Sequence, residues 1–224
     1  MTDNYQLLPE WTQQDAVMLV WPDQHTDWKP WLDDVQNVYL KIIESLNQAK
    51  TNVVLLVRSS EIKNCLNKLN KSAQILIVKA DYNDTWIRDY GFLSCANEST
   101  LQPIEFAFNG WGQKFDAAKD NKINQDVLSQ LCQQAIKSVD IVVEGGALEI
   151  DQNGTLLSTE LCLTNPKRNG NKSIAAYQQV FQNFLGVKQS IILQNGHLEG
   201  DDTDGHIDTL VRFTPNNGLV SRLS

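Results

Sequence analysis

Apolar residues along this chain fall into short runs that alternate with stretches at helical spacing. The run at residues 16–21 has the length of a buried strand and ends at Pro22, and apolar residues then recur from Trp31 to Leu46 every three or four positions. The same alternation continues to a strong turn at residues 214–218. Strands and helices mixed in this way predict an α/β fold. The other expected strands lie at residues 52–57, 74–78, 86–94, 104–108, 139–143, 148–150, 155–163, 190–193, 206–213 and 219–220, and the other expected helices at 61–69, 123–137 and 173–185.

Acidic loops interrupt these apolar elements at three places. The most concentrated one, residues 201–208, places four aspartates and a glycine around His206. If this segment is extended, the side chains of His206 and Asp208 project from the same face, ~7 Å apart. Asp89 lies in the second loop and Glu144 in the third. Because each loop is flanked by apolar strands, we expect the three to form one acidic pocket.

The acidic loops recur at a spacing of about sixty to seventy residues, which indicates stacked modules that each bury an apolar face against the next. The sequence ends one strand into a further module. An open sheet edge with an exposed apolar face promotes aggregation. We therefore expect either a fragment or a chain that something else completes.

The charge balance excludes several classes of partner. With a net charge of −8 the surface repels phosphates, so neither nucleic acid nor an acidic membrane is expected as a partner. A small cationic ligand fits the sign of the charge better. The 42% hydrophobic content of the 224 residues suits a globular core, and no apolar run is long enough to span a bilayer.

The four cysteines, at positions 65, 95, 132 and 162, are far apart and include no CxxC pair. Neither a zinc site nor a short disulfide loop is therefore indicated, and a reducing cytosol suits this pattern. Residues 1–5 offer no basic region of a secretion signal. We expect a cytoplasmic protein.

Four motifs, in order along the chain, resemble those of the agmatine deiminase family, the bacterial relatives of peptidylarginine deiminases. The motifs are WIRDYG at residues 86–91, EGG at 144–146, NPKRN at 165–169 and DGHID at 204–208, and the segments around residues 9–11 and 21–22 are similar too. The resemblance runs from about residue 9 to about residue 218. It implies the pentein fold, an α/β-propeller of five ββαβ modules around a pseudo-fivefold axis. Residues 1–224 would then form a single, C-terminally truncated domain with modules near residues 9–82, 83–143 and 144–200 and the start of a fourth at 201–224.

The resemblance also implies a reaction on a guanidinium, which is planar and permanently cationic and whose N–H groups suit paired carboxylates. By the resemblance Asp89 and Asp208 hold the substrate, Trp86 packs against it, and Glu144 is a further substrate-binding residue. In the family a cysteine thiolate attacks the guanidinium carbon, ammonia leaves, and water hydrolyses the covalent intermediate, with His206 as the acid and then the base. Agmatine would give N-carbamoylputrescine for putrescine and polyamine biosynthesis, and the reaction requires neither a metal nor a cofactor.

The nucleophilic cysteine of the family has no counterpart in this sequence. In the family it lies near the C-terminus, in a glycine-rich segment of the fifth module. Cys95 lies on an apolar strand and the other three cysteines lie in helical or strand runs, where small buried thiols are common. We therefore expect the intact protein to be a hydrolase and residues 1–224 alone to be inactive.

Each motif also has a purely structural interpretation. His206 and Asp208 could satisfy a loop, Asp89 could pair with Arg88, and the two glycines after Glu144 could permit a tight turn. The acidic run could bind calcium, although it lacks EF-hand spacing. The alternative functions are a non-catalytic guanidino-binding or interaction fragment and a peptidylarginine deiminase. The sequence leaves open agmatine, arginine derivatives or peptidyl arginine as the substrate, and leaves open the oligomeric state, a homo-oligomer included.

Overall fold

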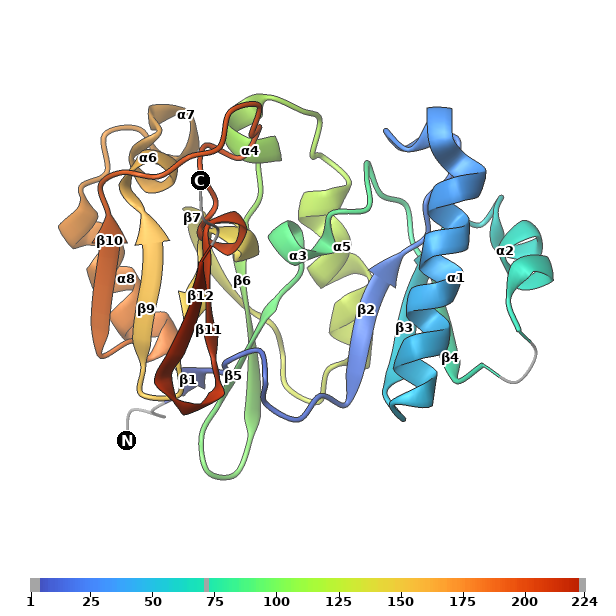
Figure 1. Cartoon of the computed structure of the whole chain (residues 1–224), viewed down its shortest axis with the longest axis horizontal. Helices are drawn as coiled ribbons and strands as arrows, with labels where there is room; N and C mark the ends of the chain where they lie inside the picture. Colours follow the sequence, from blue (N-terminus) through green and yellow to red (C-terminus); the bar gives the residue numbers. More distant parts are fainter. Residues whose placement is uncertain (1–4, 71–72, 222–224) are drawn as a thin grey trace. The chain divides into compact units, whose positions relative to one another are not determined.

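A three-stranded parallel sheet, β2-β3-β4, and a four-stranded mixed sheet, β1-β5-β6-β7, belong to different parts of the chain (Figure 1). The computed structural model describes two continuous stretches, residues 5–70 and 73–221. The chain divides into two units, which we call the parallel-sheet unit and the site unit. The parallel-sheet unit consists of residues 13–87 and 118–130, and the site unit of residues 1–12, 88–117 and 131–224.

Residues 1–4, on which the expectation of a missing secretion signal partly rests, lie outside the described residues. Within the part of the chain that the structure describes, no helix is both long enough and apolar enough to cross a bilayer.

The parallel sheet follows the expected alternation of strands and helices. Parallel neighbours need crossover connections, and two helices supply them: α1 (Leu32–Gln48) connects β2 (Ala16–Val20) to β3 (Asn52–Val57), and α2 (Ile62–Lys68) connects β3 to β4 (Ile75–Lys79). The short elements of this unit are η1 (Lys29–Trp31), η2 (Asp120–Lys122) and α5 (Ile123–Asp126), and η3 (Leu128–Leu131) ends at the boundary of the unit.

The core of this unit lies between the sheet and α1. Trp21, Ile43 and alternate residues of β3 are buried together there. The apolar spacing located α1 correctly but not its buried face, because Val38 is 52% exposed while Gln36 is 1% exposed. The Gln36 amide donates a hydrogen bond of 2.8 Å to the carbonyl of Pro22, which compensates for the burial of a polar side chain.

The site unit contains two sheets and a hairpin. In the first sheet β1 and β5 are antiparallel, β5 and β6 are antiparallel, and β6 and β7 are parallel. In the second sheet β8 and β9 form the expected hairpin and β10 adds parallel to β9. The strands are β1 (Gln6–Leu7), β5 (Leu93–Ala96), β6 (Leu101–Ala107), β7 (Lys137–Val142), β8 (Glu149–Ile150), β9 (Thr155–Thr159), β10 (Gln189–Leu193) and the antiparallel pair β11 (Val211–Thr214) and β12 (Gly218–Ser221).

The long helix of this unit, α8 (Ile174–Leu185), has the ends that the sequence indicates. Ser173 caps its N-terminus by accepting a hydrogen bond from the backbone N–H of Ala176, and Gly186 ends it with a φ of 63°. The buried face of α8 packs into the core of the unit with residues of β5, β6 and β9. The remaining helices are α3 (Ile87–Tyr90), α4 (Gly110–Gln113), α6 (Glu160–Thr164), α7 (Pro166–Asn169), η4 (Gly145–Ala147), η5 (Ile207–Thr209) and η6 (Pro215–Asn217).

The strand expected at residues 86–94 is wrong in its first half, where the structure has α3 instead. Asp84 accepts a hydrogen bond of 2.7 Å from the backbone N–H of Thr85, and the N–H of Ile87 donates to the carbonyl of Thr85. Such side-chain contacts favour a turn into a helix over an extended chain. Only the second half, β5, is a strand, so Asp89 lies on a helix.

Two other elements are shorter than expected. The helix expected at 123–137 is broken into α5 and η3, which ends at Leu131, and the last expected residue, Lys137, instead begins β7 and pairs with Ile104 of β6. The strand expected at 155–163 ends at Thr159, whose hydroxyl accepts a hydrogen bond from the N–H of Cys162 and caps α6. Cys162 therefore lies on a helix.

The extended segment expected at residues 206–213 is also wrong in its first half. Asp204 and Gly205 have φ values of 66° and 82°, which turn the chain, and η5 follows. His206 and Asp208 are therefore not alternate residues of one strand, and their proximity has another cause.

Candidate active site

Gly146 lies where three of the expected site residues meet. It belongs to η4, directly after β7 and Glu144. A Cβ atom on residue 146 would lie 2.6 Å from Oδ1 of Asp89, 2.6 Å from Nδ1 of His206 and 2.8 Å from Oδ2 of Asp208. The structure therefore brings these three side chains together around one glycine, which a larger residue could not occupy without displacing them.

Two N–H donors fix the carboxylate of Asp89. The backbone N–H of Gly146 donates to Oδ1 at 2.9 Å, and the indole Nε1 of Trp111 donates to Oδ2, also at 2.9 Å. Trp111 has a φ of 55°, between two glycines that also have positive φ values. From the sequence alone Trp111 is a buried indole in a loop, so this partner of Asp89 is missed. The signal for it was an indole N–H, which needs an acceptor when it is buried.

His206 is 2% exposed and lies between two acids. Its Nδ1 is 3.5 Å from Oδ1 of Asp89, and its Nε2 is 3.8 Å from Oε2 of Glu144. Burial by itself lowers the pKa of an imidazole, but the contacts with Cys162 and Glu144 and the charge of Asp89 outweigh it and raise the pKa of His206 to about 10. The ring is therefore cationic at neutral pH and can donate a proton.

The acidic run before His206 stabilises its own loop. Asp201 accepts hydrogen bonds from the backbone N–H groups of Thr203 at 2.9 Å and Gly205 at 2.7 Å. The hydroxyl of Thr203 in turn accepts from the N–H of His206 at 3.1 Å. These contacts hold the backbone that carries the imidazole, so part of the acidic run has a structural role.

Glu144 belongs to a buried ion-pair network. It is fully buried, and both of its carboxylate oxygens accept hydrogen bonds from Nε of Arg168, at 2.9 and 3.0 Å. Arg168 also donates from Nη1 to Asp204 at 2.7 Å and from Nη2 to the carbonyl of Thr203 at 3.0 Å. Burial alone would raise the pKa of Glu144, but His206 and Arg168 outweigh it and hold that pKa below its usual value. Arg168 thus connects the acid that faces His206 to the loop that carries His206.

Glu144 is expected from the sequence to contact the substrate, and this role stays a prediction. Its carboxylate has no exposed surface, and its partners are Arg168 and the imidazole of His206. In this arrangement the carboxylate of Glu144 faces the imidazole of His206. Arg168 lies in the NPKRN motif, but the sequence gives no reason to select it, because its partners are distant in the chain.

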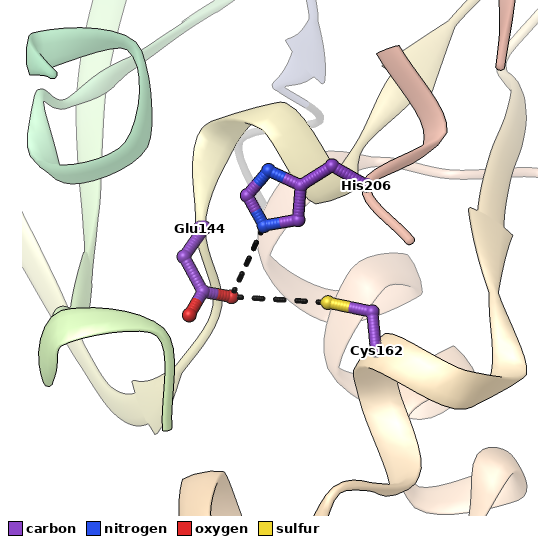
Figure 2. A group of neighbouring side chains, drawn as sticks. All are labelled: Glu144, Cys162 and His206. Carbon is purple, nitrogen blue, oxygen red and sulfur yellow. Dashed lines mark hydrogen bonds and ion pairs between the residues drawn. The ribbon is translucent and has the colours of Figure 1, made fainter. Parts of the chain in front are cut away.

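Cys162 lies beside Glu144 and His206 (Figure 2). Its Sγ is 4.0 Å from Oε2 of Glu144, and one ligand atom from each of the three residues lies within 4.8 Å of the others. Burial raises the pKa of the Cys162 thiol, so the neutral form, a weak nucleophile, predominates at neutral pH. The three atom types could bind a metal ion. A cation at this point would, however, be repelled by the guanidinium of Arg168 and by a protonated His206.

Asp208 and Trp86, two further expected site residues, differ in burial and belong to different units. Asp208 is half-buried, and burial, only partly offset by His206, raises its pKa. Trp86 is 44% exposed and belongs to the parallel-sheet unit, where its ring lies 5.6 Å from that of Trp28. The role of Trp86 toward a substrate stays a prediction.

A buried, cationic histidine surrounded by acids can transfer protons to a small molecule bound beside it, and this arrangement defines a class of α/β protein. The comparisons agree with such a class. The family model described as Porphyromonas-type peptidyl-arginine deiminase matches residues 6–223. The chain belongs to this family.

Its relatives include agmatine and arginine deiminases. A provisionally named agmatine deiminase of Yersinia pseudotuberculosis is 32% identical over 217 residues, 94% of this chain and 58% of that protein. A substrate-bound cysteine-to-serine variant of the agmatine deiminase of C. jejuni has a TM-score of 0.85 at 31% identity, over 97% of this chain and 64% of that one. A provisionally named arginine deiminase of Porphyromonas gingivalis has a TM-score of 0.84 at 38% identity, over 93% and 62%. The chain thus spans less than two thirds of the length of these relatives.

Proposed function

We propose that this protein is a hydrolase of the agmatine deiminase type, which converts agmatine and water to N-carbamoylputrescine and ammonia. The observation that carries the proposal is the meeting of Asp89, His206 and Asp208 around Gly146, within 2.8 Å of one point. Membership of a family whose relatives carry deiminase names supports it.

Binding would use the two aspartates. A guanidinium donates paired hydrogen bonds in one plane, and two carboxylates on separate segments can accept them from two of its edges. Asp89 is suited to this because the N–H groups of Gly146 and Trp111 already fix its orientation. The charge of the bound cation would also favour the ionised form of Asp208, whose pKa burial raises.

The chemical steps would use His206 for the proton transfers. A cysteine thiolate adds to the guanidinium carbon, and the C–N bond to one terminal nitrogen breaks as that nitrogen takes a proton from the imidazolium and leaves as ammonia. The neutral imidazole then removes a proton from water, whose oxygen attacks the same carbon. The C–S bond breaks, the thiolate is restored, and the ureido product is released once the hydroxyl proton on its oxygen passes to the solvent. Glu144 stabilises the imidazolium, as its distance of 3.8 Å from Nε2 of His206 allows.

The nucleophile in this proposal is none of the four cysteines in residues 1–224. Burial raises the pKa of Cys65 and Cys95 to about 12 and also raises the pKa of Cys132 and Cys162, so the thiolate is a minor form of each at neutral pH. A chain limited to these residues would therefore bind the guanidino ligand without turning it over.

The proposed architecture is that of a pentein, with modules near residues 9–82, 83–143 and 144–200 and part of another at 201–224. Apart from β1, which precedes β2 but pairs with β5, the strands of the three sheets and the β11–β12 hairpin follow one another along the chain in an order that supports this division. Trp86 would pack against the aliphatic part of the substrate.

Agmatine is the favoured substrate because the acidic surroundings would repel the carboxylate of free arginine. Isothermal titration calorimetry with agmatine, arginine and cadaverine tests this, since cadaverine is a diamine of similar length that has an ammonium group at each end and no guanidinium. The proposal predicts the highest affinity for agmatine. Equal affinity for cadaverine would refute a guanidinium site, and tighter binding of arginine would refute agmatine as the substrate.

A further inference from the structure

The parallel-sheet unit contains a cavity of about 570 Å³ at the carboxyl ends of β3 and β4. Arg58, Ser59 and Ser60 directly follow β3, and Lys79 is the last residue of β4. The carboxyl ends of parallel strands are where α/β sheets commonly bind small ligands, and this volume is within the range of small-molecule pockets. The lining residues are Arg58, Ser59, Ser60, Lys79, Ala80, Asp81, Lys119, Lys122, Ile123, Asp126 and Val127.

The charge around this cavity is opposite to that of the whole chain. Four of its lining side chains are cationic and two are carboxylates, in a protein whose net charge is −8. Asp81 pairs with Arg58 and Lys119, so its charge is compensated. Among the described residues neither Lys79 nor Lys122 has an ion-pair partner, and the hydroxyls of the two serines have no hydrogen-bond partner.

The type of donor indicates the type of anion. The guanidinium of Arg58, the group that would suit a carboxylate, is already bonded to Asp23 at 2.6 Å, to Asp81 and to the carbonyl of Tyr82. The free donors are ammonium groups and hydroxyls, which are single-point donors and can surround a tetrahedral oxyanion from several directions. The half-buried Val127, with the edges of the mostly buried Ala80 and Ile123, gives the cavity an apolar side that inorganic phosphate would not need.

We propose that this cavity is a binding site for a small organic phosphate. The phosphate group contacts Lys79, Lys122 and the serine hydroxyls, and the organic part lies against the apolar side. The site contains none of the residues that we assign to guanidine chemistry, so it stands or fails independently of the proposed reaction.

Isothermal titration calorimetry of the chain with phenyl phosphate tests the proposal, with inorganic phosphate and benzoate as comparison ligands. We expect phenyl phosphate to bind more tightly than either, and its affinity to fall at least tenfold in the variant Lys79→Ala/Lys122→Ala. The matched control Lys29→Ala/Lys41→Ala removes the same charge from exposed lysines of the same unit and should leave the affinity unchanged. Absence of binding, an equal loss in both double variants, or benzoate binding as tightly as phenyl phosphate would overturn the proposal.

Discussion

The substitution Gly146→Ala tests the arrangement of the site with the smallest change that can disturb it. The backbone of Gly146 is not in the left-handed region, so alanine causes no conformational strain there. The added methyl group would lie 2.6 Å from both Asp89 and His206 and 2.8 Å from Asp208, and these side-chain atoms must move away. We therefore expect a stable protein with an altered site.

The magnitude follows from the contact that would be lost. Moving Asp89 breaks its 2.9 Å hydrogen bond with the N–H of Gly146 and misplaces its carboxylate. A hydrogen bond to a charged group contributes about 2 kcal/mol, which corresponds to a loss of affinity of about 30-fold. Calorimetric titration with agmatine measures the affinity, and urea unfolding shows whether the variant remains folded.

Two other glycines are controls for Gly146→Ala. Gly145→Ala should prevent stable folding, because its Cβ would lie 2.0 Å from the carbonyl oxygen of Arg88. Gly200→Ala should leave agmatine binding unchanged, since no atom lies within 4 Å of its added methyl group. Its φ of 80° strains an alanine there, which should cost about 1 kcal/mol of stability. An affinity of Gly146→Ala within twofold of the unchanged chain would refute our description of the site.

Three further predictions concern groups around the site and in the parallel-sheet unit. Arg168→Met should lower the free energy of unfolding by about 3–5 kcal/mol, because the buried carboxylate of Glu144 loses its guanidinium donor. Urea titration at pH 7 measures this, and a loss below 1 kcal/mol would contradict the network. Trp111→Phe keeps an aromatic ring but removes the N–H donor to Asp89, so agmatine affinity should fall about 30-fold, the effect of losing about 2 kcal/mol. Unchanged calorimetric affinity would show that the donor is dispensable. Burial raises the pKa of Asp120 to about 7, above its value in the unfolded chain. Between about pH 4 and 7 the carboxyl of Asp120 is therefore protonated in the folded protein and ionised in the unfolded chain. The free energy of unfolding should then fall as the pH rises through this interval. Asp120→Asn should make the urea midpoint less dependent on pH over this range, and an unchanged dependence would show that another group titrates.

The sequence predicts the regular elements of this fold better than its turns. The buried run of β3 and the capped helix α8 appear as expected, because apolar periodicity and end signals are local properties. The segment at residues 86–94 was misjudged since contacts of Asp84 and Thr85 favour a helical turn. The segment after Thr159 was misjudged for a similar reason, because a hydroxyl cap begins α6.

The candidate site could likewise be predicted only in part. Asp89, His206 and Asp208 could be selected from acidic loops and from the resemblance, but the expected reason for their proximity, an extended strand, was wrong. What brings them together is Gly146, whose missing side chain leaves room for all three. The partners Trp111 and Arg168 could not be identified, because their contacts join residues 22 and 24 positions apart through folding. The buried indole of Trp111 indicates that it needs an acceptor, but not which one.

The central claim, that Asp89 and Asp208 bind one guanidinium, is tested most directly by calorimetric titration of the variants Asp89→Ala and Asp208→Ala with agmatine. The control is Asp140→Ala, which removes an exposed acid of the same unit. Convergence of two carboxylates on one guanidinium predicts that each of the first two substitutions weakens binding at least tenfold, while the third leaves it unchanged. Wild-type affinity in both the Asp89 and the Asp208 variants would contradict it.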